Sequence, residues 1–423
     1  MTQGPTAGMT QASSPIRLTA VLTHPVQYYA PWFRHIAARC REIDLTVLYA
    51  TQPTAEQQGV GFRQAFQWDV PLTDGYRCRV LRPARPEESV HSDRFWGLDV
   101  PEISSAIRES RPDIALIPGW HSVTLARALW ACRGQAVPAL YRGDNNLGTA
   151  PTDWWRGPWA LRTRLLLRLF DGYLSVGKHA RAYLERFGAR DSLIWDAPHC
   201  VDTEFFGRAA AAHQTPEARR AARAAFGLPR EAFVVLFAGK LEPKKRPLDL
   251  VRAIAQMSAP VSLLVVGNGD REAECRAEAR KLGVGLHWAG FLNQTELGRV
   301  YAAADCLALP SDWGETWGLV VNEALASGLP CVVSDRVGCA PDLITPGETG
   351  EVFAAGDVSA LAGSLERVRG RARAGHDAAP GCRARAEMYS FSAATAGLAA
   401  ACVTLARPPA AVGATADEEG ILT

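Results

Sequence analysis

Two glutamates in the stretch SDWGETWGLVVNEALASGLP, Glu315 and Glu323, lie eight residues apart around the start of an apolar run. At about 100° per residue, that spacing keeps the two side chains off a common helix face. We therefore expect Glu315 in a loop and Glu323 on a helix that begins near Trp317. Carboxylates accept hydrogen bonds from vicinal hydroxyls, and amides at a helix N-terminus, here Trp317, Gly318 and Leu319, attract an anion. The pattern predicts one crevice that receives both hydroxyls and negative charge.

A second stretch, GKLEPKKRP, could supply the rest of that crevice. It follows an apolar run, and Gly239 offers a tight turn at its start. Phosphate is the natural ligand of such a strand-to-helix junction, because amides and flexible ammonium groups meet its charge together. Alone, this stretch also fits a solvated basic turn, and the two glutamates fit a helix-start acid and a solvent-facing residue. The cations of the stretch are Lys240, Lys244, Lys245 and Arg246.

A third loop, GNGD, follows another apolar run and begins with Gly267 and Asn268. A Gly-x-Gly turn lets the backbone approach a ligand closely, although the same turn occurs in ordinary strand-to-helix connections. Together the three loops predict a ligand with hydroxyls at its two ends and phosphates between them. A nucleotide sugar has that chemistry.

The composition is that of a soluble globular protein. The 423 residues are 48% hydrophobic and 21% charged, enough for about two or three domains. Lysine and arginine number 46 against 44 acidic residues, so no net field would draw the chain to nucleic acid. The ten cysteines are scattered without a C-x-x-C pair, which favours core thiols in a reducing compartment over disulfides.

No membrane-directing segment is expected. The first fifteen residues are polar and lack the pattern of a secretory signal, and no apolar run looks long enough to span a membrane. We therefore predict a cytoplasmic protein. The stretch WWRGPWALRTRLLLRLF, residues 154–170, mixes tryptophan, leucine and arginine in a way that suits the inner, anionic face of a membrane. An ordinary helix of the first domain explains it equally well.

The elements that must hold these loops form two series. Short apolar runs alternate with helical stretches, which is typical of βαβ units around parallel sheets. We expect a flexible N-terminus at 1–15, a first domain at 16–200, an interdomain linker region at 201–230, a second domain at 231–390, a closing helix at 391–406 and a flexible tail at 407–423. The predicted strands are 18–22, 45–49, 114–117, 139–141 and 173–176, then 233–238, 261–266, 286–288, 306–309 and 331–334.

The stretch GETWGLVVNEALASGLPCVVSDRVGCAPDLI resembles the E-x7-E region of retaining glycosyltransferases of family 4. Their GT-B fold consists of two facing Rossmann-like domains with a deep cleft between them. The stretches PHCVD, FAGKLEPKKRPLDLVRAI, LLVVGNGD and HWAGFLNQTELGRVYAAADCLALPS also occur in the family's order, so the resemblance covers nearly all of the second domain.

The resemblance implies roles for the second domain. Glu315 would contact hydroxyls of the donor sugar and Glu323 the ribose, while Lys240 and Lys245 would hold the diphosphate. Lys240 stands where many members have arginine, which keeps the charge but loses bidentate binding. The remaining donor-binding residues would be Gly239, Gly267, Asn268, Phe291, Thr316, Trp317, Gly318 and Leu319.

The implied reaction is a retaining transfer of a hexose-type sugar from a nucleotide diphosphate sugar to a hydroxyl acceptor. The acceptor would be a glycan, a lipid-linked molecule or a secondary metabolite. Stabilisation of the departing diphosphate by the lysines and helix amides would drive the reaction. The chain has no Asp-x-Asp, so neither a metal nor another cofactor is expected, and no nucleic-acid partner.

The first domain resembles the family less. Its first loop, THPVQYYAPW, has no glycine, and the place of the family's frequent active-site histidine holds YRGDNN, with GWHS one strand earlier. We predict His121 as a catalytic residue, although a histidine satisfied by a backbone partner is an alternative. Arg142 and Asp144 could instead form an internal ion pair. The predicted acceptor-binding residues, which hinge closure around 198–202 would bring to the donor, are His24, Gln27, Tyr28, Trp120, Arg142 and Asp144.

Other classes were weighed against this interpretation. A nicotinamide-dependent oxidoreductase would have G-x-G-x-x-G after its first strand, which this chain lacks. A nucleotide-sugar epimerase shares the GT-B architecture and would differ by acting without an acceptor. A non-catalytic sugar-nucleotide-binding protein would keep the pocket but lose Glu315 or the lysine pair, and neither is lost here.

Overall fold

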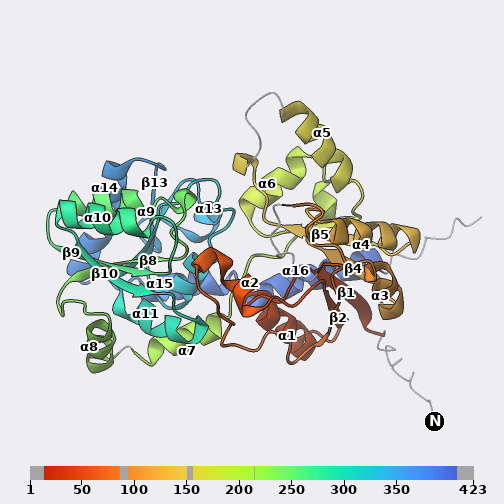
Figure 1. Ribbon diagram of the computed structural model, residues 1–423, viewed down its shortest axis with the longest axis horizontal. Helices are drawn as coiled ribbons and strands as arrows, with labels where there is room; N and C mark the ends of the chain where they lie inside the picture. Colours follow the sequence, from red (N-terminus) through yellow and green to blue (C-terminus); the bar gives the residue numbers. More distant parts are fainter. Residues whose placement is uncertain (1–13, 86–93, 150–155, 214, 407–423) are drawn as a thin grey trace, which may run out of the picture.

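The computed structural model describes residues 14–85, 94–149, 156–213 and 215–406. Of the expected flexible ends, 1–15 and 407–423, residues 1–13 and 407–423 lie outside the described residues. Two parallel sheets form two lobes that lie side by side (Figure 1). The first sheet has the strand order β3-β2-β1-β4-β5-β6-β7 and the second β10-β9-β8-β11-β12-β13. Both place the first strand of the series near the centre, as a doubly wound fold does.

The first sheet contains two strands that the sequence did not predict. β3 is an exposed edge strand of sequence RCRV, and β7 has only three residues, so neither offers an apolar run. The other strands match the predicted ones within two residues at each end. The strands of the first sheet are β1 (Ile16–Leu22), β2 (Ile43–Tyr49), β3 (Arg77–Val80), β4 (Ile114–Ile117), β5 (Ala139–Gly143), β6 (Gly172–Ser175) and β7 (Ile194–Asp196).

The second sheet has one unpredicted strand, β13, whose apolar pattern is broken by Glu351. That side chain is 6% exposed and pairs with Arg367 and Arg371, which offsets the burial of its charge. The strands are β8 (Phe233–Ala238), β9 (Val261–Val266), β10 (Gly285–Gly290), β11 (Cys306–Leu309), β12 (Cys331–Ser334) and β13 (Gly350–Phe353).

Helices cover both faces of the two sheets (Figure 1). Those placed between strands of the first domain are α1 (Tyr29–Arg39), α2 (Ala55–Gly59), α3 (Ile103–Ser110), α4 (Val123–Gly134), α5 (Arg156–Leu167) and α6 (Lys178–Arg186). Those that follow are α7 (Thr203–Ala211), α8 (Pro216–Ala225), α9 (Pro247–Ala255), α10 (Glu272–Leu282), α11 (Leu297–Ala303), α12 (Leu319–Ala326), α13 (Ala340–Leu343), α14 (Val358–Arg373), α15 (Ala379–Glu387) and α16 (Phe391–Ala406). Short 3-10 turns are η1 (Val60–Phe62), η2 (Leu147–Thr149), η3 (Asp191–Leu193), η4 (Pro243–Lys245) and η5 (Gln294–Glu296).

The expected linker region at 201–230 is part of the second domain. Its helices α7 and α8 pack against α11, and α7 also packs against α12, because each has an apolar side to bury. The chain therefore crosses between domains within a few residues, at about 197–202. It returns through α16, which packs against β6, β7 and α1 of the first domain (Figure 1). The indole of Trp32 donates a 3.1 Å hydrogen bond to Thr395 of this helix.

One expectation about apolar runs is not met. Among the described residues, the helical run Ala379–Ala406 is long and apolar enough, by length and composition alone, to cross a membrane. Met388 to Ser390 interrupt it between α15 and α16, and α16 packs one face on the first sheet. All ten cysteines are free, and nine of them are buried.

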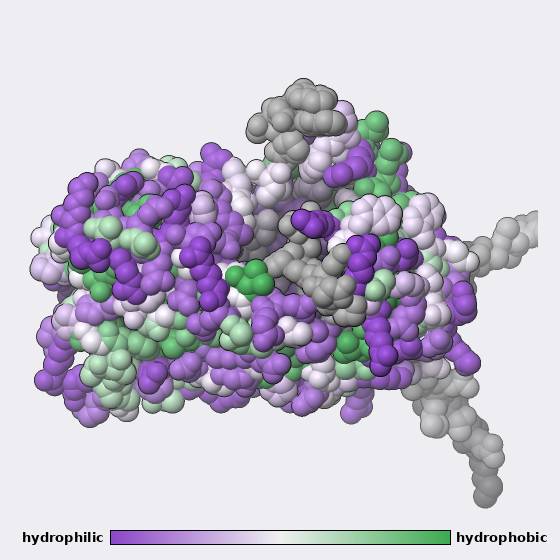
Figure 2. All heavy atoms as spheres, viewed as in Figure 1, coloured by the Kyte–Doolittle hydropathy of each residue, from purple (hydrophilic) through white to green (hydrophobic). Residues whose placement is uncertain are grey.

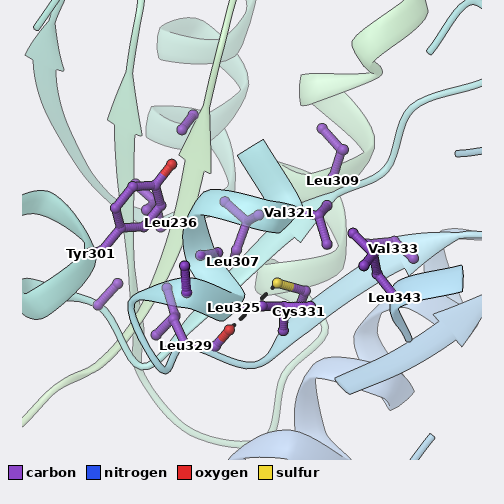
Figure 3. Close-up of a cluster of buried hydrophobic side chains, with 14 of the residues drawn as sticks. Leu236, Tyr301, Leu307, Leu309, Val321, Leu325, Leu329, Cys331, Val333 and Leu343 are labelled. Carbon is purple, nitrogen blue, oxygen red and sulfur yellow. Dashed lines mark hydrogen bonds between the residues drawn. The ribbon is translucent and has the colours of Figure 1, made fainter. Parts of the chain in front are cut away.

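The core of the second domain holds α12 in place. Figure 3 shows Val321 and Leu325 of this helix packed against Leu307 of β11 and Cys331 of β12. The ring of Tyr301 borders the same cluster. Close packing leaves α12 little freedom to shift, so the loop before it is presented rigidly.

Candidate active site between the two domains

Glycines let three strand-end turns of the second domain lie close together. Gly239 after β8 and Gly267 after β9 have positive φ values of 140° and 115°. A Cβ atom on Gly267 would overlap the carbonyl oxygen of Gly239, so only glycine fits there. Asn268 and Phe291 follow on the turns after β9 and β10. The second sheet therefore brings the predicted donor-binding turns to one edge.

The four cationic side chains of the turn after β8 have different partners in the structure. Lys245 forms an ion pair with Glu315, and their side chains are only 13% and 14% exposed. Lys240 points elsewhere, to the first-domain residue Phe62, with its ammonium 5.1 Å from the ring centroid. The other two cations pair outside this cluster: Lys244 with Glu242 at 3.6 Å and Arg246 with Asp249 at 2.6 Å.

The helix after Glu315 starts two residues later than expected. α12 begins at Leu319 because Gly318 adopts a left-handed backbone with φ 98°, which ends the preceding loop. Glu323, one turn into the helix, accepts a 2.6 Å hydrogen bond from the Tyr301 hydroxyl. Burial raises the pKa of the Glu323 carboxyl to about 7, although the Tyr301 hydrogen bond opposes that rise. The two glutamates thus lie on a loop and a helix, as their spacing predicted.

The side chain of Trp317 lies in the core, which leaves its backbone amide for the predicted donor contact. The indole is 4% exposed and donates a 2.8 Å hydrogen bond to Asn322, inside the core of the second domain. Only the backbone of Trp317 lies in the loop that leads to α12. Its neighbour Thr316 is turned the other way, and its hydroxyl donates a 2.6 Å hydrogen bond to Asp144 of the first domain.

A 370 Å³ pocket opens at the strand ends of the first domain. It brings together five of the six predicted acceptor-binding residues and the predicted catalytic His121: His24, Tyr28, Trp120, His121, Arg142 and Asp144. The sixth, Gln27, lines instead a separate hollow of 1440 Å³ between α1, α7 and α16, which Tyr28 also borders. The structure therefore gives Gln27 no place in the smaller pocket.

The pocket includes residues that sequence reasoning missed. Trp159 and Arg162 come from α5, where the pattern showed only an amphipathic helix, and Tyr183 comes from α6. Asn145 also lines the wall and donates a 2.7 Å hydrogen bond to the hydroxyl of Tyr141. Asn145 closely follows β5 within the stretch YRGDNN, but Trp159, Arg162 and Tyr183 lie on helices away from the strand ends in sequence, so no local signal marked those three.

Arg142 has several partners within the fold. Its side chain is 2% exposed and donates to the hydroxyl of Tyr29 at 2.7 Å and to the carbonyl oxygens of Ala197 and Pro198 at 3.3 and 3.1 Å. The guanidinium also stacks over Trp32, 4.7 Å from the ring centroid. Among the described residues it has no ion pair with Asp144. Arg142 therefore holds the interdomain connection while it also lines the pocket, and its role in acceptor binding stays a prediction.

His199, in that connection, completes the floor of the pocket. Its Nε2 lies 3.9 Å from the Asp144 carboxylate, and its carbonyl oxygen accepts a 3.2 Å hydrogen bond from Asn322. Burial and the charge of Arg142 lower the pKa of His199, so the imidazole is neutral at pH 7 despite the nearby carboxylate. The sequence marked this residue only as part of the PHCVD connection.

The two other histidines of the pocket differ from His199. His24 shares a 3.0 Å hydrogen bond with Thr23 through Nδ1. His121 is exposed at the rim, where the pocket walls lower its pKa against the opposing charge of Asp144. His121 is therefore free to meet a ligand, whereas His24 is already oriented by a neighbour.

Several contacts join the two domains next to the first-domain pocket. A Cβ atom on Gly148 would overlap the Trp313 ring, so the indole lies directly on the first-domain backbone. The Asp342 carboxylate accepts from the amide of Lys178 at 3.1 Å, where it caps α6 from the other domain. With the Asp144–Thr316 bond, these contacts place the first-domain pocket beside the Lys245–Glu315 pair.

Comparison with known proteins finds similarity over the second domain. Residues 218–369 match the family described as Glycosyl transferases group 1. The chain is 36% identical over 173 residues to a D-inositol 3-phosphate glycosyltransferase of Nocardioides sp. and 35% identical over 203 residues to that of Mycobacterium tuberculosis. These matches cover 36% and 46% of this chain, and only 37% and 40% of the relatives' own length.

Solved structures resemble the whole fold. HepE of Anabaena, in complex with UDP, superposes with a TM-score of 0.68 at 15% identity over 91% of this chain and 99% of its own. Sucrose-phosphate synthase of Thermosynechococcus elongatus gives 0.68 at 18% identity over 90% and 97%. A glycosyltransferase of Rickettsia africae gives 0.70 at 12% identity over 94% and 100%. The expected GT-B fold is confirmed.

Proposed function

We propose that this protein is a glycosyltransferase that moves a sugar from a nucleoside diphosphate to a hydroxyl acceptor. One observation carries the proposal: the hydrogen bond between Asp144 and Thr316 joins an aromatic-walled pocket of the first domain to the loop that holds Glu315. The pocket that would bind the acceptor thus lies next to the edge of the second domain that would bind the donor.

The donor would lie along the strand ends of the second domain. Lys245 and the amides at the start of α12 would hold the diphosphate, and Glu315 would accept hydrogen bonds from the transferred sugar. Glu323 would receive the ribose hydroxyls, for which it would exchange the hydrogen bond from Tyr301. The family match over residues 218–369 and the UDP complex of HepE support this assignment.

The acceptor would lie in the first-domain pocket. Tyr28 and Trp120 offer aromatic faces for a sugar ring or an apolar group, and Asp144 can accept a hydrogen bond from the attacking hydroxyl. The curated relatives carry inositol phosphate in their names, but their matches to this chain are partial. The glycine-free first loop favours a different acceptor.

The transfer proceeds with retention in this proposal. The acceptor oxygen bonds to the anomeric carbon on the face from which the diphosphate leaves, the bond from that carbon to the phosphate oxygen breaks, and the departing phosphate takes the hydroxyl proton. Lys245 stabilises the charge that develops on the leaving group. The E-x7-E spacing of Glu315 and Glu323 supports this class, and the absence of Asp-x-Asp from the sequence supports a donor site without a paired-aspartate metal.

The test is an assay of the purified chain against a panel of nucleotide sugars, with release of nucleoside diphosphate measured in the presence and absence of sugar acceptors. We expect one donor to be used, with release that depends on the acceptor, and a Glu315→Gln variant to be inactive. Isomerisation of a free nucleotide sugar without acceptor would favour an epimerase of the same architecture. Tight nucleotide-sugar binding without any turnover would favour a binding protein.

A further inference from the structure

A first-domain segment, Gly59–Asp69, lies on the donor edge of the second domain. It follows β2 and α2 and reaches across the gap between the lobes (Figure 1). Its residues contact the turns after β8, β9 and β10, which carry Lys240, Asn268 and Phe291. The segment therefore covers the half of the donor edge that lies away from Glu315.

Lys240 is held by this segment. Its ammonium lies 5.1 Å from the centroid of the Phe62 ring, and a Cβ atom on Gly61 would overlap that ammonium. A cation over an aromatic face is an attractive contact that partly replaces an anion. Lys240, to which the family resemblance assigns the diphosphate, thus has a first-domain partner in place of an anion.

Asn268 and Phe291 are held in the same way. The side-chain amide of Asn268 donates to Gln64 at 3.3 Å. The Phe291 ring lies 5.0 Å from Phe62 and 4.3 Å from Phe66, centroid to centroid. Rings this close leave no room for a nucleobase between them, so a base could stack on Phe291 from this side only after the segment has moved.

Contacts at the edges of the segment attach it to the second domain. Arg63 pairs with Asp270, though both side chains are about two-thirds exposed, at 64% and 66%. The Asp69 carboxylate accepts from the backbone amide of Thr295 at 3.2 Å, and Asn293 donates to the carbonyl oxygen of Gln67 at 2.7 Å. Exposed ion pairs and single hydrogen bonds of this kind are weak, which permits reversible release.

We propose that Phe62, Gln64 and Phe66 compete with the nucleotide for the donor edge, so that these first-domain residues set the affinity for the donor. The inference rests on the proposed function and extends it, since it assumes that the nucleoside diphosphate also reaches Lys240 and Phe291. The nucleotide must displace the segment, and its apparent affinity falls by the fraction of molecules in which the segment is docked.

The test is calorimetric binding of UDP and GDP to the full chain and to Phe62→Ala, without acceptor. Loss of the ring frees Lys240 and removes one of the two rings that pack on Phe291, so we expect binding about three- to tenfold tighter. Gln64→Ala should tighten binding about twofold. A matched control is Phe95→Ala, which removes a 42% exposed phenylalanine of the same domain, whose ring contacts Trp96, and should leave binding unchanged.

Hydrogen exchange of the backbone amides of residues 59–69 gives a second measurement. Competition predicts faster exchange there when UDP is added to the unaltered chain. Weaker UDP binding by Phe62→Ala, or slower exchange of the segment with UDP, would mean that the segment closes over the nucleotide, and would overturn the proposal. Failure of both proteins to bind any nucleoside diphosphate would instead overturn the donor site itself, and the competition with it.

Discussion

The strand ends of the two sheets build their half-sites in different ways. In the second domain, Gly239, Lys245 and Glu315 lie within a few residues of a strand end, on turns that short motifs specify. In the first domain, the pocket also takes side chains from helices α5 and α6 and from the interdomain connection. The residues of the donor edge therefore come from short βα turns that are local in sequence. The residues of the acceptor pocket come together only when elements distant in sequence pack.

The largest effect that this comparison predicts follows loss of the Lys245–Glu315 pair. Lys245→Ala and Glu315→Gln should each lower turnover about a hundredfold or more, because each removes a nearly buried charged group that acts on the departing diphosphate or the sugar. Steady-state assays with the donor found in the panel would measure this. Lys245→Ala also leaves a carboxylate unpaired, so its thermal unfolding should be recorded alongside.

Lys244→Ala is the matched control for that prediction. Lys244 is the adjacent residue, but its ammonium faces Glu242 at 3.6 Å and its side chain is 46% exposed. We expect turnover within about threefold of the unaltered chain, as for a surface ion pair of little energetic weight. Near-normal turnover by a folded Lys245→Ala protein would contradict the diphosphate assignment.

The next effect concerns the first-domain pocket alone. Tyr28→Ala should raise the KM for the acceptor about tenfold and leave nucleotide-sugar binding unchanged, since its ring lines only the first-domain side of the site. Gln27→Ala makes the test more specific, because the sequence predicts that Gln27 binds the acceptor whereas the structure places it outside the first-domain pocket. From its place in the separate hollow we expect unchanged acceptor kinetics. An equal loss of donor affinity in Tyr28→Ala would show that the two half-sites are not separate.

Glu323→Gln should affect stability and binding in opposite directions. The folded state raises the pKa of Glu323 from 4.5 to about 7, so the unfolded chain binds fewer protons than the folded one within that window. The contribution of this group to the free energy of unfolding therefore falls as pH rises from 4.5 to 7 and then levels off. Since the side chain is only half-buried, we expect Glu323→Gln to gain about 1–2 kcal/mol at pH 8 in urea unfolding.

The same substitution should weaken nucleotide binding most at high pH. Above pH 7 the carboxylate of the unaltered chain is ionised and accepts hydrogen bonds from ribose hydroxyls more strongly than an amide does. Calorimetry at pH 6 and 8 would measure the difference. A difference in affinity between the variant and the unaltered chain that is the same at both pH values would contradict the ribose assignment. A variant that loses stability at pH 8 would contradict the raised pKa of Glu323.

The smallest predicted effect concerns membrane binding. We propose that the first domain contacts a membrane through α5. Leu161 and Leu165, 60% and 52% exposed, lie one turn apart near exposed Arg162 and Arg164, and Figure 2 shows hydrophobic side chains at this end of the molecule. Trp154 and Trp155 of the predicted interfacial stretch lie outside the described residues. The contact would place the enzyme at the inner, anionic face of a cytoplasmic membrane.

Changing both leucines to serine should lower co-sedimentation with anionic vesicles severalfold, with Leu282→Ser on the second domain as the control. Binding that is equal on neutral and anionic vesicles, or absent from both, would end the proposal.

Local patterns in the sequence were enough to predict most strands of both series and the turns that follow them in the second domain. Apolar runs such as 233–238 and 306–309 correspond to strands because both faces of a parallel sheet are buried. Strands without such a run, β3, β7 and β13, were missed. Glu315 and Glu323 were assigned to a loop and a helix because their spacing is a local property, although the left-handed Gly318 moved the helix start to Leu319.

The partners of the individual side chains became known only from the packing of the two domains. Arg142 and Trp317 resemble ligand-binding residues in sequence, yet they satisfy backbone carbonyls and Asn322 within the interior. His199 and Phe62 carry no local mark, yet the first lines the pocket beside Asp144 and the second lies over Lys240. The physical reason is that hydropathy and backbone preference act over a few residues. The partner of a polar or aromatic side chain is chosen by segments that come together only when the two domains pack.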